Sequence, residues 1–120
     1  MIEIIAGLPD NVVGVDAKGT VTADDYEKVL IPALDDTIKR HAKVRMLYLM
    51  GKEFKTITPG AMFDDAKMGF RHLNAFEKIA FVTDVEWVSN AIKIFSVMIP
   101  CPVETFGNDK LAEAKDWLLK

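Results

Sequence analysis

The sequence predicts an α/β domain whose mixed five-stranded sheet begins with an N-terminal antiparallel hairpin and carries four helices, in the order β-β-α-β-α-β-α-β-α. Short segments rich in Val, Ile and Leu alternate with longer segments whose apolar residues recur at helical spacing. The later helical segments have the length of right-handed crossovers between parallel strands. Because 120 residues suffice for one domain with its own core, residues 1–120 are expected to form a single domain.

The hairpin is predicted from two Ile- and Val-rich segments, residues 1–6 and 11–17. Between them lies Leu8-Pro9-Asp10-Asn11, and Pro and Asx residues favour a tight reversal of the chain. We therefore expect two antiparallel strands at the start of the domain.

The first helical segment covers residues 23–40. Thr22 and Asp25 have the spacing of a capping box, which satisfies free amides at a helix start. Pro32 removes one backbone donor inside the segment and predicts a kink or two shorter helices. The expected buried stripe consists of Tyr26, Leu30, Ala33, Leu34 and Ile38.

Three strands and three helices complete the expected order. The strands are predicted at 44–50, 79–83 and 103–106, and the helices at 60–73, 85–99 and 110–119. The nearly continuous apolar run from Val44 to Met50 is typical of a central strand covered on both faces, whereas 103–106 is expected nearer an edge. Asn108 is a candidate N-cap for the last helix.

The segment 85–99 is apolar on more than one helical face. One stripe, formed by Val88, Ala91, Ile92, Phe95 and Ile99, has the spacing that packs a helix on a core. A second set spreads the apolar surface sideways and consists of Trp87, Ile94, Val97 and Met98. At about 1.5 Å per residue the helix cannot cross a bilayer of about 30 Å. Its surplus apolar surface is therefore expected to meet protein, an apolar ligand or a membrane surface.

Composition and charge exclude several classes. Lys and Arg number 15 against 18 Asp and Glu, giving a net charge of −3. No cluster interleaves basic and aromatic residues, so no nucleic-acid partner is expected. The single Cys101 cannot form an internal disulfide, and the N-terminus lacks the pattern of a signal peptide. We expect a cytoplasmic protein, with peripheral contact at the membrane left open.

The order of elements, together with several short motifs, resembles the SpoIIAA-like family. The motifs are Thr58-Pro59-Gly60-Ala61, Asp64-Asp65, Gly69, Ile79-Ala80, Asp84, Trp87, Phe95, Phe106 and the closing Ala114 to Trp117-Leu118. This family belongs to the STAS group and is related to the Sec14 or CRAL-TRIO lipid-binding type. The resemblance implies a STAS fold and a non-enzymatic regulatory or ligand-binding module, with contact at a membrane as one open alternative.

The turn before residue 60 is where sporulation-type STAS antagonists carry a phosphorylated serine, and here the Asp-Ser-Ser-Gly pattern is missing. Thr56 and Thr58 are the possible phosphoacceptors. Thr58 followed by Pro59 is also what a helix start prefers, and capping is the favoured interpretation. The same turn is a candidate anion or head-group site formed by Lys52, Lys55, Thr56 and Thr58.

A small amphiphilic pocket is hypothesised where this polar turn meets apolar walls. The wall residues are Phe54, Ile57, Phe63, Trp87, Phe95 and Met98. Such a set lines a ligand pocket in many proteins. Ordinary core packing is the competing interpretation, because aromatic and Met residues at helical spacing are usually buried against one another.

Catalytic patterns are weak. His41 and His72 are the only histidines, and with one Cys they give no metal-ligand spacing. Asp64 and Asp65 project about 100° apart on a helix and cannot form a carboxylate dyad. Asp64 is expected to pair with Lys67 at the surface. No enzymatic activity, catalytic residue, metal or cofactor is expected.

Two functions follow from these observations. The first is a non-enzymatic module that binds an apolar or amphiphilic, lipid-like small molecule or associates peripherally with a membrane. The alternative is a protein-interaction module of the STAS anti-sigma-antagonist type, acting as a homodimer or with a regulatory partner.

Overall fold

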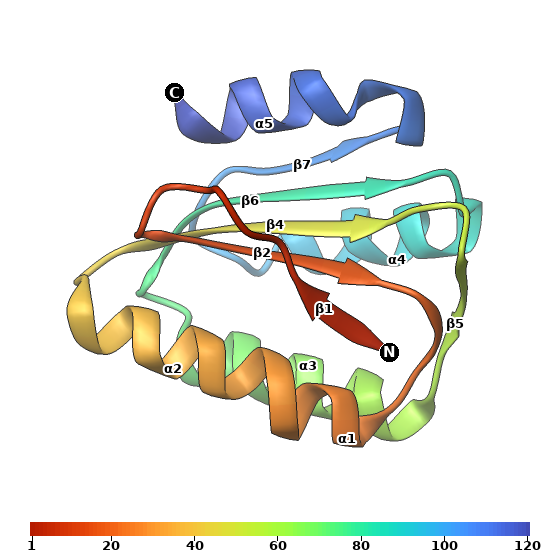
Figure 1. The fold of residues 1–120 in the computed structure, drawn as a ribbon, viewed down its shortest axis with the longest axis horizontal. Helices are drawn as coiled ribbons and strands as arrows, with labels where there is room; N and C mark the ends of the chain where they lie inside the picture. Colours follow the sequence, from red (N-terminus) through yellow and green to blue (C-terminus); the bar gives the residue numbers. More distant parts are fainter.

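Strand β4 (Val44–Met50) lies at the centre of a five-stranded sheet in the computed structural model, which describes residues 1–120 (Figure 1). The strands are ordered β1 (Ile2–Ile4), β2 (Val12–Ala17), β4, β6 (Phe76–Thr83) and β7 (Val103–Phe106). β1 is antiparallel to β2, and all other neighbours are parallel. The predicted mixed sheet, hairpin and edge strand are confirmed.

The helices divide unequally between the two faces of the sheet. One face carries α1 (Ala23–Asp25), α2 (Ile31–Arg40), α3 (Pro59–Arg71) and α4 (Glu86–Ser96). The other carries α5 (Leu111–Leu119), which follows a 3-10 turn at Asn108–Lys110. Helices that join successive parallel strands in one direction across a sheet share a face, because such crossovers are right-handed.

Side chains of β4 alternate between the two resulting cores. Met46, Tyr48 and Met50 belong to the larger core under α1 to α4, whereas Leu47 belongs to the smaller core under α5. This is the period of two expected for a strand. It directs the Tyr48 ring toward the face on which the three crossover helices lie.

The first helical segment is continuous but irregular. Thr22 Oγ1 accepts from the Asp25 amide, and the Thr22 amide donates to Asp25 Oδ2 at 2.8 Å, so the predicted capping box is present. A π-helical turn at Tyr26–Leu30 separates α1 from α2, and Pro32 lies in the first turn of α2. Pro cannot donate and clashes with the carbonyl four residues earlier, so a widened turn just before it relieves both problems.

A second, two-stranded parallel sheet was not anticipated from the sequence. It pairs β3 (Gly19–Val21) with β5 (Phe54–Ile57). β3 leads into α1 and β5 leads into α3, so this pairing holds the starts of the two helices together. Strands this short show too few alternations to be recognised by periodicity.

Three expected boundaries are wrong. β6 begins at Phe76, three residues before the predicted start. α4 ends at Ser96, three residues before the predicted end. The chain then forms tight turns, with hydrogen bonds from Met98 N–H to Phe95 O and from Ile99 N–H to Ser96 O. A residue before Pro is disfavoured in helical geometry, which explains an end ahead of Pro100. Asn108 does not cap α5, because Lys110 occupies the N-cap position and Asn108 Oδ1 has no hydrogen-bond partner. The backbone N–H of Asn108 donates to Asp84 Oδ1 at 2.8 Å.

An apolar cavity with a buried polar network

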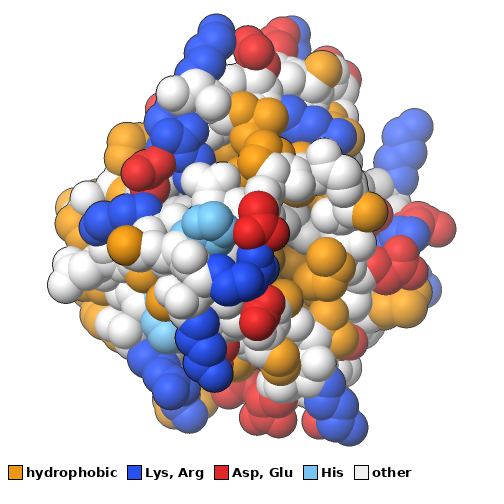
Figure 2. Space-filling model, turned by 60° about the vertical axis from the view of Figure 1, so that its left-hand side comes forward, with side chains coloured by type: hydrophobic (Ala, Val, Ile, Leu, Met, Phe, Trp, Pro, Cys, Tyr) orange, Lys and Arg blue, Asp and Glu red, His pale blue; other side chains and the backbone are white.

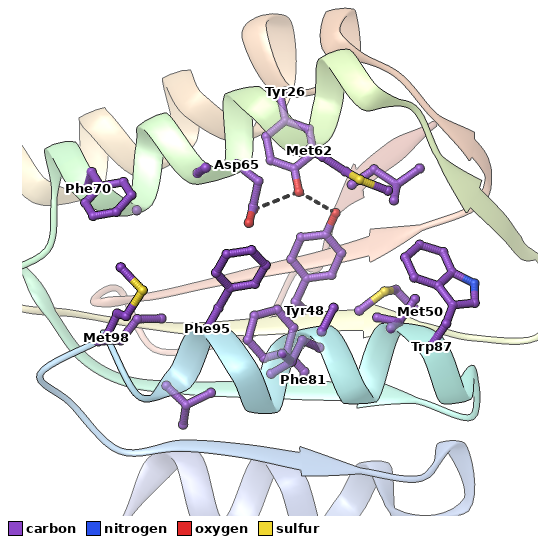
Figure 3. Close-up of a pocket in the computed structure, with 18 of the residues that line it drawn as sticks. Tyr26, Tyr48, Met50, Met62, Asp65, Phe70, Phe81, Trp87, Phe95 and Met98 are labelled. Carbon is purple, nitrogen blue, oxygen red and sulfur yellow. Dashed lines mark hydrogen bonds between the residues drawn. The ribbon is translucent and has the colours of Figure 1, made fainter.

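A cavity of about 260 Å³ lies between α3 and α4, above the face of the sheet that carries these helices (Figure 3). Seventeen of its 19 lining residues are hydrophobic. α3 contributes Met62 and Phe70, whereas Trp87 and Phe95 come from α4. Tyr48 and Phe81, whose rings are stacked with centroids 5.7 Å apart, come from the sheet.

Small residues on the facing sides of the two helices leave this space open. Ala66 and Gly69 of α3 and Ala91 of α4 all line the cavity. A Cβ atom added to Gly69 would meet nothing within 4 Å. Protein interiors are otherwise packed to the density of organic crystals, so an unfilled volume of this size distinguishes the site from ordinary core.

A hydrogen-bonded network of Tyr26, Tyr48 and Asp65 supplies the polar groups of the cavity (Figure 3). The Tyr26 hydroxyl donates to Asp65 Oδ1 at 2.9 Å and lies 2.9 Å from the Tyr48 hydroxyl. A phenol has a single O–H group, and that of Tyr26 is used in its hydrogen bond to Asp65. Tyr48 must therefore be the donor to Tyr26, and the network runs in one direction toward the carboxyl.

Burial sets the protonation of this network. It raises the pKa of the Asp65 carboxyl above its usual range, although the hydrogen bond from Tyr26 acts in the opposite direction. Burial, followed by the nearby Asp65, raises the pKa of Tyr26, and burial likewise raises the pKa of Tyr48. Both phenols therefore stay protonated at neutral pH and serve as fixed donors.

The structure brings together four of the six residues predicted to form a pocket. Ile57, Trp87, Phe95 and Met98 line the cavity. Phe54 is buried in the larger core instead, because its position on β5 faces inward. Phe63 is 64% exposed, since the cavity face of α3 runs through positions 62, 65, 66, 69 and 70.

The predicted anion site does not adjoin the cavity. Lys52 and Lys55 are exposed beside Met1 and Lys18, in a shallow polar depression on another part of the surface. Thr56 is exposed on β5. Thr58 Oγ1 accepts from the Ala61 amide at 3.2 Å and caps α3, as the favoured interpretation predicts.

Sequence reasoning missed the polar network. His72 lies outside this network, and its Nε2 lies 2.9 Å from Asp35 Oδ1. The expected surface pair of Asp64 with Lys67 is wrong, because Asp64 is buried and its Oδ2 has no hydrogen-bond partner. Lys67 lies over the Phe63 ring, 5.4 Å from its centroid. The one feature of the sequence that points to the network is that Asp65 lies in an otherwise apolar stripe of its helix.

Apolar surface continues outside the cavity. Val97 is 85% exposed and Ile94 is 70% exposed, and neither lines the cavity. Met98 and Trp87 at the rim are 59% and 46% exposed. The surplus apolar surface predicted for the segment 85–99 is therefore exposed on the molecule.

No three His, Cys, Asp or Glu side chains are grouped so that they could hold a metal ion. His41 lies with its Nε2 2.8 Å from Asp10 Oδ2 on the exposed surface, away from the cavity lining. None of the helices has the length and apolar composition required to cross a membrane.

The mixed sheet with its crossover helices on one face defines a STAS-type α/β module. Residues 12–119 match the model of the SpoIIAA-like family, and the chain belongs to that family. Its fold is similar to that of an uncharacterised protein of the DUF3478 family from Shewanella loihica, whose crystal structure has a SpoIIAA-like fold. The two are 24% identical with a TM-score of 0.78, over 98% of this chain and 92% of that one. No curated protein matches the sequence.

Proposed function

We propose that this protein is a non-enzymatic module that binds a small apolar or amphiphilic molecule in the cavity between α3 and α4. Membership of the SpoIIAA-like family supports a regulatory interaction or binding module in general. The observation that carries the finer proposal is an open space of about 260 Å³ lined almost entirely by hydrophobic side chains. Ligand sites are typically such concave, mostly apolar spaces with a few placed polar groups.

The size of the cavity sets the size of the molecule. An engineered cavity of about 150 Å³ lined by apolar side chains holds benzene, so about 260 Å³ has room for roughly ten non-hydrogen atoms. Because Phe70, Phe95 and Met98 line the cavity and are themselves exposed, a longer chain can leave it along the surface. A medium-length acyl or alkyl chain fits these dimensions.

Filling the cavity tests the proposal. Ala91→Phe places a ring inside it, whereas Ala112→Phe makes the same change at an exposed position of α5, across the sheet. We expect native mass spectrometry of gently purified protein to show a bound small molecule in the wild type and A112F. A91F should carry no such bound molecule. It should also bind naphthalene, an apolar probe of the right size, at least tenfold more weakly than the wild type does.

A wild-type protein that carries no bound mass and shows no thermal shift with naphthalene would contradict the proposal. Retention of naphthalene by A91F would also contradict it, because the probe would then occupy another place.

A membrane surface is the second candidate, favoured by the apolar groups that a molecule in the cavity cannot cover. Residues 66–76 and 87–103 contain no Asp or Glu, but they include Lys67, Arg71 and Lys93. Both segments contribute to one end of the cavity, where Phe70 and Met98 lie (Figure 3). Figure 2 turns the end of the molecule where α3 and α4 finish toward the viewer, and apolar side chains are exposed there beside basic and acidic ones. Apolar groups flanked by Lys and Arg favour an anionic lipid surface.

Vesicle flotation tests this second candidate. We expect the wild type to float with vesicles that contain phosphatidylglycerol, and Val97→Asp to reduce the bound fraction severalfold, because a carboxylate would enter the lipid interface. Leu119→Asp, which alters an exposed apolar residue of α5, should bind like the wild type. If the wild type ignores vesicles and elutes as a dimer that V97D dissociates, the protein-interaction alternative is correct instead.

A further inference from the structure

The carboxyl of Asp65 has an unused hydrogen-bonding capacity inside the cavity. Its Oδ1 accepts from Tyr26, and no hydrogen bond within the protein reaches its Oδ2, which unlike Asp64 Oδ2 is not sealed from the cavity. An ionised carboxylate has about four lone-pair sites, so a single hydrogen bond leaves most of its capacity unmet. A carboxylate in apolar surroundings with few partners is poorly stabilised, and a donor on a molecule in the cavity would supply one of the missing hydrogen bonds.

The two phenols cannot supply that donor. The Tyr26 O–H already donates its hydrogen bond to Asp65, and the Tyr48 O–H donates to Tyr26. Both phenol O–H groups are therefore used inside the network, so the network offers the cavity only hydrogen-bond acceptors. The remaining lining side chains are hydrophobic.

We propose, building on the function proposed above, that Asp65 is the head-group anchor of the cavity and selects amphiphiles whose polar end donates a hydrogen bond, such as an alcohol or an amine, over carboxylates. An alkyl carboxylate is an acceptor without a donor at neutral pH, and it would meet the like charge of Asp65 in a poorly solvated space. The basic residues outside the cavity, Lys67, Arg71 and Lys93, would by themselves favour the opposite order. The ranking of ligands therefore separates selection by Asp65 from general attraction of anions.

Three probes of nearly equal size measure this ranking at neutral pH by calorimetry and ligand-observed NMR. Nonylamine, nonanol and octanoate each have about ten non-hydrogen atoms, the number that the cavity accommodates. We expect at least one of the two donors to bind tenfold or more tightly than octanoate. Asp65→Asn keeps the shape of the side chain and its acceptor toward Tyr26, but it replaces the unpartnered oxygen with a donor. In D65N the preference should disappear or reverse.

Asp24→Asn is the matched control, because it removes one negative charge from an exposed position of α1 outside the cavity lining. It should preserve the wild-type ranking. The proposal is overturned if octanoate binds the wild type as tightly as both donors, or if D65N keeps their advantage. Should D65N fail to fold, the wild-type ranking alone decides.

Naphthalene, which has no polar group, separates this inference from the proposed function. Binding of naphthalene without any binding of the two donors would overturn the role of Asp65 and leave the cavity function standing. If none of the four probes binds, the cavity function itself fails, and the anchor fails with it.

Discussion

The protonation of Asp65 follows from two opposed effects. Burial favours the neutral carboxylic acid, and the hydrogen bond from Tyr26 favours the carboxylate. Burial is the larger effect, since the pKa of Asp65 is raised from 3.8. The ionised carboxylate is therefore a net cost to the folded protein, and this cost is consistent with a group retained for binding.

A stability difference between Asp65→Asn and the wild type should depend on pH. The folded protein holds the Asp65 proton to a higher pH than the unfolded chain, whose carboxyl titrates near 3.8. The free energy of unfolding of the wild type therefore falls as the pH rises through this interval, and the cost is complete above the raised pKa. We expect D65N to melt at a higher temperature than the wild type at pH 7. This difference in melting temperature should vanish as the pH falls toward the pKa of the carboxyl in the unfolded chain.

Differential scanning calorimetry across this pH range makes the measurement. Asp24→Asn again serves as the control, because no comparable burial acts on that exposed carboxyl. A D65N advantage that stays constant down to the lowest pH would show that the effect comes from packing and not from ionisation.

At the scale of elements, the start of α3 depends on its cap. Thr58 has extended backbone geometry, its hydroxyl accepts from the Ala61 amide, and Pro59 occupies the first helical position. The backbone N–H of Thr58 donates to Val21 O at 2.9 Å, so this residue also joins the helix start to the small β3–β5 sheet. The cavity face of α3 is therefore positioned by its N-terminus.

Replacing Thr58 with Ala should cost about 1 kcal/mol of stability, the usual loss for an N-cap threonine. Thr56→Ala is the matched control, because the Thr56 hydroxyl is exposed on β5 and makes no cap hydrogen bond. Chemical denaturation of both variants measures the difference. Equal losses in the two would mean that the hydroxyl of Thr58 contributes nothing through capping.

Long elements with clear periodicity could be predicted, and so could the short edge strand 103–106, but the π-helical turn, β3 and β5 could not. The central strand 44–50 was predicted to the residue, because seven nearly continuous apolar residues have few alternative structures. The Tyr26–Leu30 π-helical turn lacks a distinct pattern, since it shares its apolar stripe with the α-helix that continues from it. β3 and β5 depend on a pairing between segments more than 30 residues apart along the chain, which local patterns do not encode.

The candidate site was only partly accessible from the sequence, for a related reason. Trp87, Phe95 and Met98 belong to one helix whose surplus apolar surface is visible in its spacing. The polar network joins Tyr26, Tyr48 and Asp65 from three separate elements. Only tertiary structure brings such groups within hydrogen-bonding distance, so the anchor could not be predicted and the apolar walls could.

At the scale of the whole molecule, the sheet separates the layer that contains the cavity from the layer formed by α5. On the α5 side, Leu47, Val82, Ala114 and Leu118 form a small core of buried residues. On the other side, α4 leaves a large open volume against α3. Changes that fill or empty the cavity are therefore expected to leave the packing of α5 unaffected.

The two tryptophans of the chain lie on opposite sides of this division. Trp87 stands at the cavity rim, whereas Trp117 packs beside Phe106 at 6.0 Å between ring centroids and under the Lys78 ammonium group. Each layer thus contains its own native fluorophore. Emission from a W117F protein would monitor events at the rim alone, and emission from W87F would monitor only the opposite layer, without any attached dye.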